Sequence, residues 1–398
     1  MQEVILIHYD EIAIKRGNRK RFERRLVEHI RGKALRRNIH KNLIIKRIFG
    51  RMIIELEETL TEEKKAAYTT LLTETFGIAH ISFAKQVEQD ITLIKKEGLA
   101  LVEESNTSWS TFRVKARRLN KDFPLTSQEI EIEVGGKVAE LYKKKVNLDN
   151  PEYTLWIDIV DKRTFIYDKK IQGLRGLPYG VNGKVLLLLS GGIDSPVASY
   201  YMQKRGLEVH YIHFHSYPYT SDASIQKVRT LVTILNKFSG KSTLYLCPFS
   251  NIQKKILYSV PEEYRIIFYR RMMFRIAEKI AKDIGATALV TGEALAQVAS
   301  QTIENMTTID DAINMFVLRP LVGFDKHEII EKAKMIDTME TSVLPDEDCC
   351  TIFMPKSPLT RSNKKKTHAL ERELPFEEWI EETMKDITHE KITSQISI

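Results

Sequence analysis

A short glycine-rich motif, SGGIDS at residues 190–195, carries the clearest chemical signal in the chain. It follows an apolar run at residues 185–189, which predicts a buried strand. Its two glycines allow the backbone to turn tightly and to approach an anion closely. We expect Ser195 to cap the following helix, with Pro196 at its first position, so that the helix amides point into the loop. The motif therefore predicts a phosphate-binding loop.

Two adjacent cysteines, Cys349 and Cys350, form a second candidate site. A thiol with a pKa of about 8.5 is only weakly ionised at neutral pH, but neighbouring cations such as Lys356 or Arg361 lower that value. A disulfide between the two is not expected as a resting state, because adjacent Cα atoms lie about 3.8 Å apart and disulfides usually need about 4.4–6.8 Å. Metal or cluster ligation stays an alternative, although no CxxC spacing supports it. Cys247 lies in an apolar run and is expected in the core.

The second half of the chain supplies the framework for both candidate sites. Short apolar runs predict strands at residues 185–189, 208–214, 242–247, 288–291 and 315–318, and helical patterns separate them, the longest at 264–284. This alternation predicts a parallel, doubly wound sheet in an α/β domain at 184–398. Right-handed crossovers place ligands beyond the carboxyl ends of such strands. The charged C-terminal tail is expected to be helical or frayed, and glycine-rich residues 170–183 to form a linker.

Two smaller α/β units are predicted before the linker, at residues 1–76 and 77–169. The first combines strands at 4–8, 44–49 and 52–56 with helices at 19–37 and 61–76, and the second combines strands at 81–87, 111–117, 153–159 and 164–167 with a helix at 91–104. Thr126 and Glu129 fit a capping box that starts a further helix. Residues 15–37 contain eleven Lys or Arg. They form either a phosphate-contact surface or a solvated helix face.

The composition favours a nucleic-acid partner. Lys and Arg number 61 against 53 Asp and Glu, and the isoelectric point is near 9.1. That balance fits a polyanionic partner, although a merely basic soluble protein has the same composition. The N-terminus does not fit a signal peptide, no run approaches the roughly 18 apolar residues of a membrane span, and three cysteines do not make a disulfide framework. We therefore expect a cytoplasmic protein without a membrane partner.

The glycine-rich motif, extended to SGGIDSP, resembles the pyrophosphate loop of the ATP pyrophosphatases, which cleave ATP to AMP and pyrophosphate. It fits neither a Walker A loop nor a dinucleotide fingerprint. Further segments follow in chain order: HFHS at 213–216, YRRMM at 269–273, TGE at 291–293, QVASQT at 297–302, RPL at 319–321 and DK at 325–326. This set resembles the tRNA 4-thiouridine synthetase (tRNA uridine 4-sulfurtransferase) family over nearly the whole chain. The resemblance implies a ferredoxin-like domain at 1–76, a THUMP RNA-binding domain at 77–169 and a PP-loop ATP pyrophosphatase domain at 184–398.

The resemblance also implies a site for ATP and Mg²⁺ at the strand ends. Its nucleotide-binding residues would be Leu188, Leu189, Ser190, Gly191, Gly192, Asp194, Ser195, His213, Phe214, Arg270, Gly292 and Gln301. Asp194 would act through Mg²⁺, because a carboxylate beside phosphates needs a bridging cation, and Lys326 would neutralise developing charge. Without the resemblance, His213 is interpreted as a core histidine, Arg270 as an ion-pair partner and Lys326 as a surface lysine.

The segment around the two cysteines resembles the reactive-cysteine segment of the same family. Cys350 fits that position best, and Cys349 is the alternative. The implied reaction adenylates O4 of a tRNA uridine, the one at position eight, and then delivers sulfur to C4 from a persulfide that a cysteine desulfurase loads. tRNA contacts are assigned to basic residues of the two N-terminal domains, namely Lys15, Arg16, Arg19, Lys20, Arg113, Lys115, Arg117 and Arg118.

Three features depart from common patterns of this family. Some members carry a C-terminal rhodanese domain with a second cysteine, but no cysteine follows Arg361 here. We therefore expect the rhodanese-lacking form, in which Cys349 or a donor thiol resolves the sulfur relay and a role in thiamine thiazole synthesis stays open. Ala296 and Asp10 stand where the family usually has glycine. An alanine at position 296 is tolerable unless that position needs a positive φ.

Two rival functions stay open from the sequence. Another ATP pyrophosphatase reaction, such as amidation or lysidine formation, would not need Cys349 or Cys350. An RNA-binding protein with a relic nucleotide site would neither exchange pyrophosphate with ATP nor release AMP. A homodimer, in which one subunit delivers tRNA to the other, is a hypothesis with no sequence signal behind it.

Overall fold

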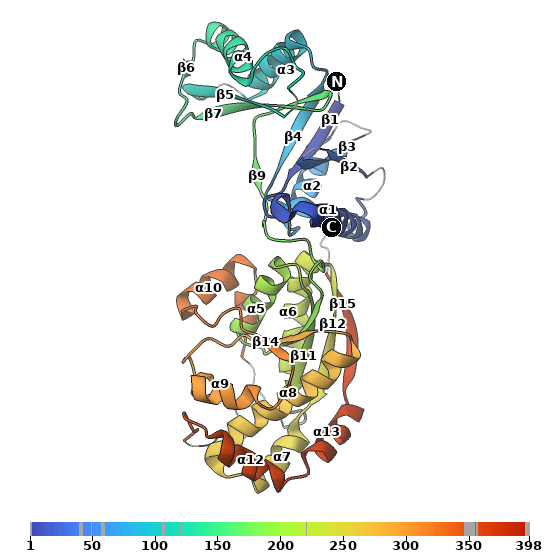
Figure 1. Ribbon diagram of the computed structural model, residues 1–398, viewed down its shortest axis with the longest axis vertical. Coiled ribbons are helices and arrows are strands. Elements are labelled where there is room, and N and C mark those ends of the chain that lie inside the picture. The colour runs from blue at the N-terminus through green and yellow to red at the C-terminus, as the bar shows by residue number, and fades with distance from the viewer. Residues whose placement is uncertain are drawn as a thin grey trace. The chain divides into compact units, whose positions relative to one another are not determined.

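The protein divides into two compact units, Met1–Pro178 and Tyr179–Ile398, which are described separately (Figure 1). A computed structural model describes residues 2–39, 43–48, 50–56, 60–105, 108–119, 121–219, 221–345, 355 and 357–394. Among these residues, no helix is both long enough and apolar enough to cross a membrane.

Unit 1 contains a nine-stranded sheet within its described residues. Its order is β2-β3-β1-β4-β8-β7-β5-β6, with β9 paired to β4. The strands are β1 (Gln2–His8), β2 (Ile44–Ile48), β3 (Arg51–Glu55), β4 (His80–Val87), β5 (Thr111–Arg118), β6 (Lys145–Val146), β7 (Tyr153–Val160), β8 (Arg163–Tyr167) and β9 (Ile171–Gln172). Because β4 pairs antiparallel with both β1 and β8, the two predicted N-terminal units share one continuous sheet.

The helices of unit 1 follow the predicted pattern closely. They are η1 (Ala13–Asn18), α1 (Arg19–Arg36), α2 (Glu62–Thr73), α3 (Ile91–Glu104) and α4 (Ser127–Tyr142). The capping box at the start of α4 is confirmed: Thr126 Oγ1 accepts from the Glu129 amide at 3.2 Å, and the Thr126 amide donates to the Glu129 carboxylate at 2.7 Å. Along β5, apolar side chains join the core with α3 and α4, while Lys115 and Arg117 are exposed on the alternate positions.

Unit 2 contains a six-stranded sheet in the order β14-β13-β10-β11-β12-β15 within its described residues. The strands are β10 (Lys184–Leu188), β11 (Glu208–His215), β12 (Lys241–Pro248), β13 (Ala288–Val290), β14 (Phe316–Leu318) and β15 (Thr388–Thr393). The first five pair in parallel, which confirms the predicted doubly wound α/β sheet. Winding reverses between β10 and β13, and ligands of such sheets bind at that reversal, outside the carboxyl ends of the strands.

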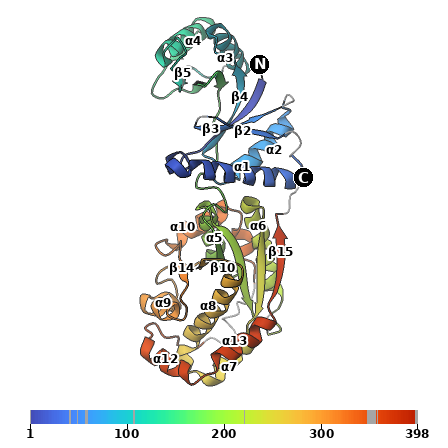
Figure 2. The ribbon, with the colours of Figure 1, turned by 45° about the vertical axis from the view of Figure 1, so that its right-hand side comes forward.

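The helices of unit 2 form two groups (Figures 1 and 2). One group packs α5 (Asp194–Lys204) with α6 (Ala223–Ser239), α10 (Lys326–Met335) and α11 (Met339–Ser342). The other packs α8 (Arg265–Asp283) with α7 (Ser250–Ser259), α9 (Ile303–Asp310) and α13 (Phe376–Lys385), and α8 also lies against β10 and β13. Shorter elements are η2 (Glu262–Tyr264), η3 (Ala299–Gln301) and α12 (Lys364–Arg372).

The expectation of a helical or frayed tail was only partly correct. Helices α12 and α13 form, but residues Thr388–Thr393 add β15 antiparallel to β12. Most side chains of β15 are exposed, so its sequence shows no apolar alternation that would have predicted a strand. Backbone pairing with β12 and bonds from α6 hold it instead, including Asn236 Nδ2 to the Ile392 carbonyl at 2.9 Å.

Candidate functional site

A cavity of about 340 Å³ lies at the carboxyl ends of β10 and β13, where the winding of the sheet reverses. Most of the predicted nucleotide residues line it: Leu188, Leu189, Ser190, Asp194, Ser195, His213, Phe214, Arg270, Gly292 and Gln301. The other two, Gly191 and Gly192, line a second cavity of about 250 Å³ together with His213 and Lys227. The structure therefore brings the predicted set together around the glycine-rich loop.

Ser195 closes this loop instead of capping the helix. Helix α5 starts at Asp194, two residues earlier than expected, and no side chain caps it. The Ser195 hydroxyl accepts from the Ser190 amide at 3.1 Å and donates to the Ser190 carbonyl at 3.2 Å. The prediction that Ser195 caps the helix was wrong, because its hydroxyl bonds back across the loop. Pro196 accordingly lies within the first turn and not at its first position.

Gly292 brings the end of β13 against the start of α5. A Cβ added at Gly292 would lie 2.7 Å from the backbone nitrogen of Ser195 and 2.9 Å from the carbonyl carbon of Asp194. Both facing atoms belong to the backbone, so no larger residue fits without displacing the helix start. Close approach, and not a positive φ, is the reason for glycine here.

Asp194 and Lys326, the predicted catalytic pair outside the cysteines, are in direct contact. Lys326 Nζ lies 2.6 Å from Asp194 Oδ1, although the two residues are 132 positions apart. Gln297 Nε2 donates to Asp194 Oδ2 at 3.2 Å. Lys326 opens α10, where a cation is disfavoured by the helix dipole. The Asp194 carboxylate and the Asp325 cap offset that penalty.

A buried carboxylate, Glu293, organises the opposite wall and was not predicted. It forms an ion pair with Arg270 and accepts from Arg319 Nε and Thr291 Oγ1, both at 2.8 Å. Burial opposes its ionisation, but Arg270 and Arg319 outweigh burial and lower its pKa. Arg270 thus lines the cavity and also forms an ion pair. Its two interpretations, as a nucleotide-binding residue and as an ion-pair partner, are therefore compatible.

Two histidines, His213 and His215, lie in the last three residues of β11 and have different surroundings. His213 is 6% exposed, and its Nδ1 lies 2.9 Å from the Leu189 carbonyl, an arrangement in which Nδ1 donates. That bond fixes the ring at the cavity wall. Burial, and then the neighbouring His213, lower the pKa of His215 to about 4, so His215 is neutral near pH 7. His215 therefore supplies no positive charge at the end of β11.

The two departures from glycine have structural consequences. Ala296 has a φ of +61°, in the left-handed region that favours glycine, so the condition under which alanine is costly is met. Its amide nevertheless bonds to the Gln301 carbonyl at 2.9 Å. In unit 1, the Asp10 carboxylate pairs with Arg175 at 2.6 Å, a contact that glycine could not make.

The residues predicted to contact tRNA lie on three elements of unit 1, namely η1, α1 and β5. Arg16 and Lys20 are exposed, and Lys15 lies 5.4 Å from the centre of the Phe22 ring. Three arginines make internal bonds: Arg19 to Glu23 at 2.7 Å, Arg113 to the Leu148 carbonyl at 3.0 Å, and Arg118 to the Phe123 carbonyl at 2.6 Å. The exposed cations Arg16, Lys20, Lys115 and Arg117 are therefore the ones presented to solvent.

Cys349, Cys350 and Lys356 lie outside the described residues, so the structure leaves the predicted sulfur site a prediction. Cys247 is fully buried in β12, and burial raises its pKa, which confirms it as a core residue. Arg361 lies on the described chain after the cysteines, 3.8 Å from Glu304.

Three family profiles match the chain in order. Residues 4–82 match the ThiI ferredoxin-like domain, residues 88–168 match the THUMP domain, and residues 180–376 match the family described as thiamine biosynthesis protein (ThiI).

Curated relatives and a solved structure match nearly the whole chain. A probable tRNA sulfurtransferase of Brevibacillus brevis is 43% identical over 394 residues, which is 99% of this chain and 97% of the relative. One of Alkaliphilus metalliredigens is 40% identical over 99% of each chain. The crystal structure of a 4-thiouridine synthetase–RNA complex with bound ATP superposes with a TM-score of 0.87 at 37% identity, covering 98% of this chain and all of that one. A protein from Pyrococcus horikoshii superposes with a TM-score of 0.63 at 26% identity, covering 84% of this chain and 99% of that one.

Proposed function

Since the chain belongs to the tRNA sulfurtransferase family, we propose that it converts a uridine of tRNA to 4-thiouridine at the expense of ATP, in the cytoplasm. The observation that carries the proposal is the contact between Asp194 and Lys326 at the mouth of the glycine-rich loop. Two residues far apart in the chain meet there, beside the cavity that the predicted nucleotide residues line.

In the first step, O4 of the uridine attacks the α-phosphorus of ATP, and the bond to the β-phosphate breaks. The leaving pyrophosphate gains negative charge, which the amides of the loop and the start of α5 are suited to stabilise. Lys326 is positioned to neutralise part of the same charge, since its ammonium already lies at the loop. Leu188, Leu189 and Phe214 line the cavity, and the adenosine would pack against them.

Asp194 is the residue that would hold Mg²⁺. Magnesium in nucleotide sites is bound by one or two carboxylates together with substrate phosphates. Asp194 provides one carboxylate at the loop, and Gln297 and Lys326 fix its orientation, so the residues present fit the ion. When bound, Mg²⁺ would supply charge neutralisation on the phosphate oxygens.

In the second step, the terminal sulfur of a persulfide on Cys350 attacks C4, and AMP leaves with the former O4. A second thiolate, from Cys349 or from the donor protein, then attacks the Cys350 sulfur. That attack releases the thiolated base and leaves a disulfide. A cysteine desulfurase would load the persulfide. Exposed cations of unit 1, among them Arg16, Lys20, Lys115 and Arg117, would hold the tRNA mainly through its phosphates.

The test is mass spectrometry of nucleosides from an unmodified tRNA transcript. The reaction contains the protein, ATP, Mg²⁺ and either sulfide or a desulfurase with cysteine. We expect 4-thiouridine that depends on ATP. In the reaction with desulfurase and cysteine, its loss in Cys350→Ser would identify the carrier, with Cys349→Ser as the matched variant. AMP without a thiolated base would favour another ATP pyrophosphatase reaction. No AMP and no thiolated base would favour the RNA-binding rival.

A further inference from the structure

Asn305, in the first turn of α9, has a fully buried side chain whose bonds reach in two directions. Its exposed fraction is 0%. Nδ2 donates to the Ala299 carbonyl and to the Leu359 carbonyl, both at 2.7 Å, and Oδ1 accepts from the Ser362 amide at 2.9 Å. Both donors of the amide and its oxygen are therefore engaged.

These bonds join two walls of the nucleotide cavity. Ala299 lines the cavity in the segment that also contributes Gln301. On the other side, Pro358 lines the cavity and immediately precedes Leu359, the second carbonyl that Asn305 holds. One side chain thus fixes the separation between the pocket segment and the chain that follows Cys349 and Cys350.

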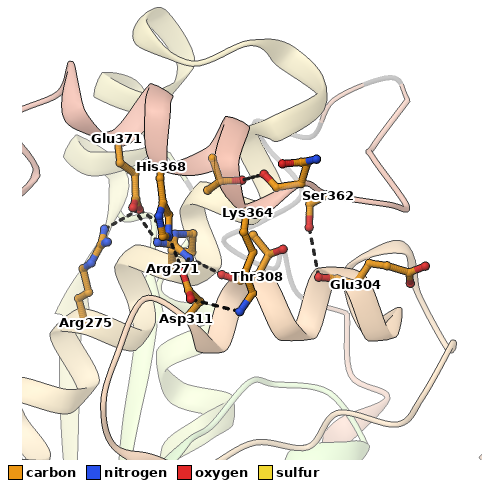
Figure 3. Close-up of polar contacts among 11 residues, drawn as sticks. Arg271, Arg275, Glu304, Thr308, Asp311, Ser362, Lys364, His368 and Glu371 are labelled. Atoms are coloured by element: carbon orange, nitrogen blue, oxygen red, sulfur yellow. Dashed lines mark hydrogen bonds and ion pairs between the residues drawn. The ribbon is translucent and has the colours of Figure 1, made fainter.

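Neighbouring contacts hold the same following chain firmly. Thr302 Oγ1 donates to the Thr360 carbonyl at 2.7 Å, and Ser362 Oγ donates to the Glu304 carbonyl at 3.3 Å. Figure 3 shows Ser362 and Glu304 beside a larger polar network that joins α12 to α8 and α9.

That network is centred on Arg271, which is 1% exposed. Arg271 forms a double contact with Glu371 at 2.6 and 2.7 Å and also bonds to the Thr308 carbonyl (Figure 3). Lys364 lies 3.2 Å from Asp311. The chain after the cysteines is therefore held against these helices, and Asn305 links it to the pocket.

The chain before the cysteines is held by a different element. Lys227 Nζ, from α6, donates to the Leu344 carbonyl at 2.7 Å, and both residues line the cavity beside Gly191 and Gly192. The described ends on either side of the cysteines thus each contact a wall of a cavity next to the glycine-rich loop.

We propose that Asn305 is a positioning residue that couples the nucleotide pocket to the chain carrying the sulfur-donating cysteine. The proposal rests on the proposed function. Asn305→Asp keeps the shape but removes both donors, and it places a carboxylate oxygen against two carbonyls. The two cavity walls that Asn305 joins would separate, and ATP would bind more weakly. Sulfur transfer to the adenylated uridine would also become slower. Water would then attack C4, expel AMP and regenerate uridine, so AMP would form without thiolation.

The experiment measures AMP released and 4-thiouridine formed by the full chain, with ATP varied. We expect Asn305→Asp to raise the KM for ATP and to lower 4-thiouridine per AMP roughly tenfold, the change that about 1.4 kcal/mol produces. The control is Asn236→Asp. Asn236 is also 0% exposed, and it bonds to the Ile392 carbonyl and to Ser239 Oγ, away from the cavity. This control should lose stability while keeping the wild-type ratio.

A milder pair of variants covers a failure of Asn305→Asp to fold. Thr302→Val removes the bond to Thr360 and the cap bond that Thr302 Oγ1 accepts from the Asn305 amide. It should lower the ratio of 4-thiouridine to AMP, whereas Thr302→Ser keeps the hydroxyl and should restore the ratio. A wild-type ratio in Asn305→Asp or Thr302→Val, or an equal fall in Asn236→Asp, would overturn the coupling while wild-type protein still thiolates tRNA. Wild-type protein that makes no 4-thiouridine would overturn the proposed function itself and the coupling with it.

Discussion

Replacing Gly292 with alanine should force the end of β13 away from the start of α5. The added Cβ would lie 2.7 Å from the Ser195 nitrogen, where ordinary contacts begin at 3.4 Å. The elements must therefore separate by roughly 0.7 Å, the difference between these distances, because both facing atoms are backbone. Overpacking of this kind destabilises by about 1–3 kcal/mol. A shift approaching 1 Å at a reacting site lowers the rate by up to about a hundredfold.

Two assays separate these effects. Urea unfolding should show a free energy of unfolding about 1–3 kcal/mol lower for Gly292→Ala, and AMP release should fall roughly ten- to a hundredfold. The control is Gly323→Ala in the same unit, since nothing lies within 4 Å of a Cβ added there. If Gly292→Ala released AMP at the wild-type rate, the close approach would not shape the site and the steric reasoning would be refuted.

Three further predictions concern stability. Ala296→Gly should raise the free energy of unfolding in urea by about 0.5–1 kcal/mol, because left-handed alanine costs about 1–2 kcal/mol and glycine returns only part of that to the unfolded chain; a less stable variant would contradict this. Arg271→Met should destabilise the folded protein by about 3 kcal/mol in thermal unfolding. This is the lower end of the range for breaking a buried ion pair, because Arg275 still contacts Glu371. An unchanged unfolding midpoint would count against it. Burial and then Arg51 lower the pKa of His8 to about 2. The contribution of neutral His8 to the free energy of unfolding is therefore full above pH 6.5, which is the pKa of His8 in the unfolded chain, and is lost as the pH falls. Between pH 5.5 and 4.5, the free energy of unfolding should fall by about 1.4 kcal/mol more in wild-type protein than in His8→Gln. Equal falls would refute the lowered pKa of His8.

The sequence predicted the framework of the site because the signals are local. The apolar run before residues 190–195 and the alternation of strands and helices placed the loop at a strand end, and the rule for reversed winding then gives the position of the cavity. Asp194 and Lys326 were assigned to the same site from resemblance alone, and their contact was not predicted. No local pattern connects a loop residue to a helix start so far along the chain.

The misses have tertiary causes. Glu293 follows a predicted strand end, but its importance depends on Arg270 and Arg319 arriving from two other elements. The Ser195 hydroxyl can bond either to the amides of the helix start or to the backbone of the loop. Spacing in the sequence alone does not decide between these two sets of partners. Strand β15 is held by backbone pairing to β12, which its polar sequence does not reveal.

The charges around the cavity indicate what recognises the nucleotide. Three cations at or beside the cavity contact three carboxylates, in the pairs Arg270–Glu293, Arg319–Asp310 and Lys326–Asp194. Their formal charges cancel, so these side chains alone give the cavity little net attraction for a polyphosphate. Their value lies in fixed direction, because each cation is oriented before the substrate arrives. Attraction must then come from groups that the ion pairs do not neutralise. These groups include the loop amides around Gly191 and Gly192 and the N-terminal end of α5, which carries a partial positive charge.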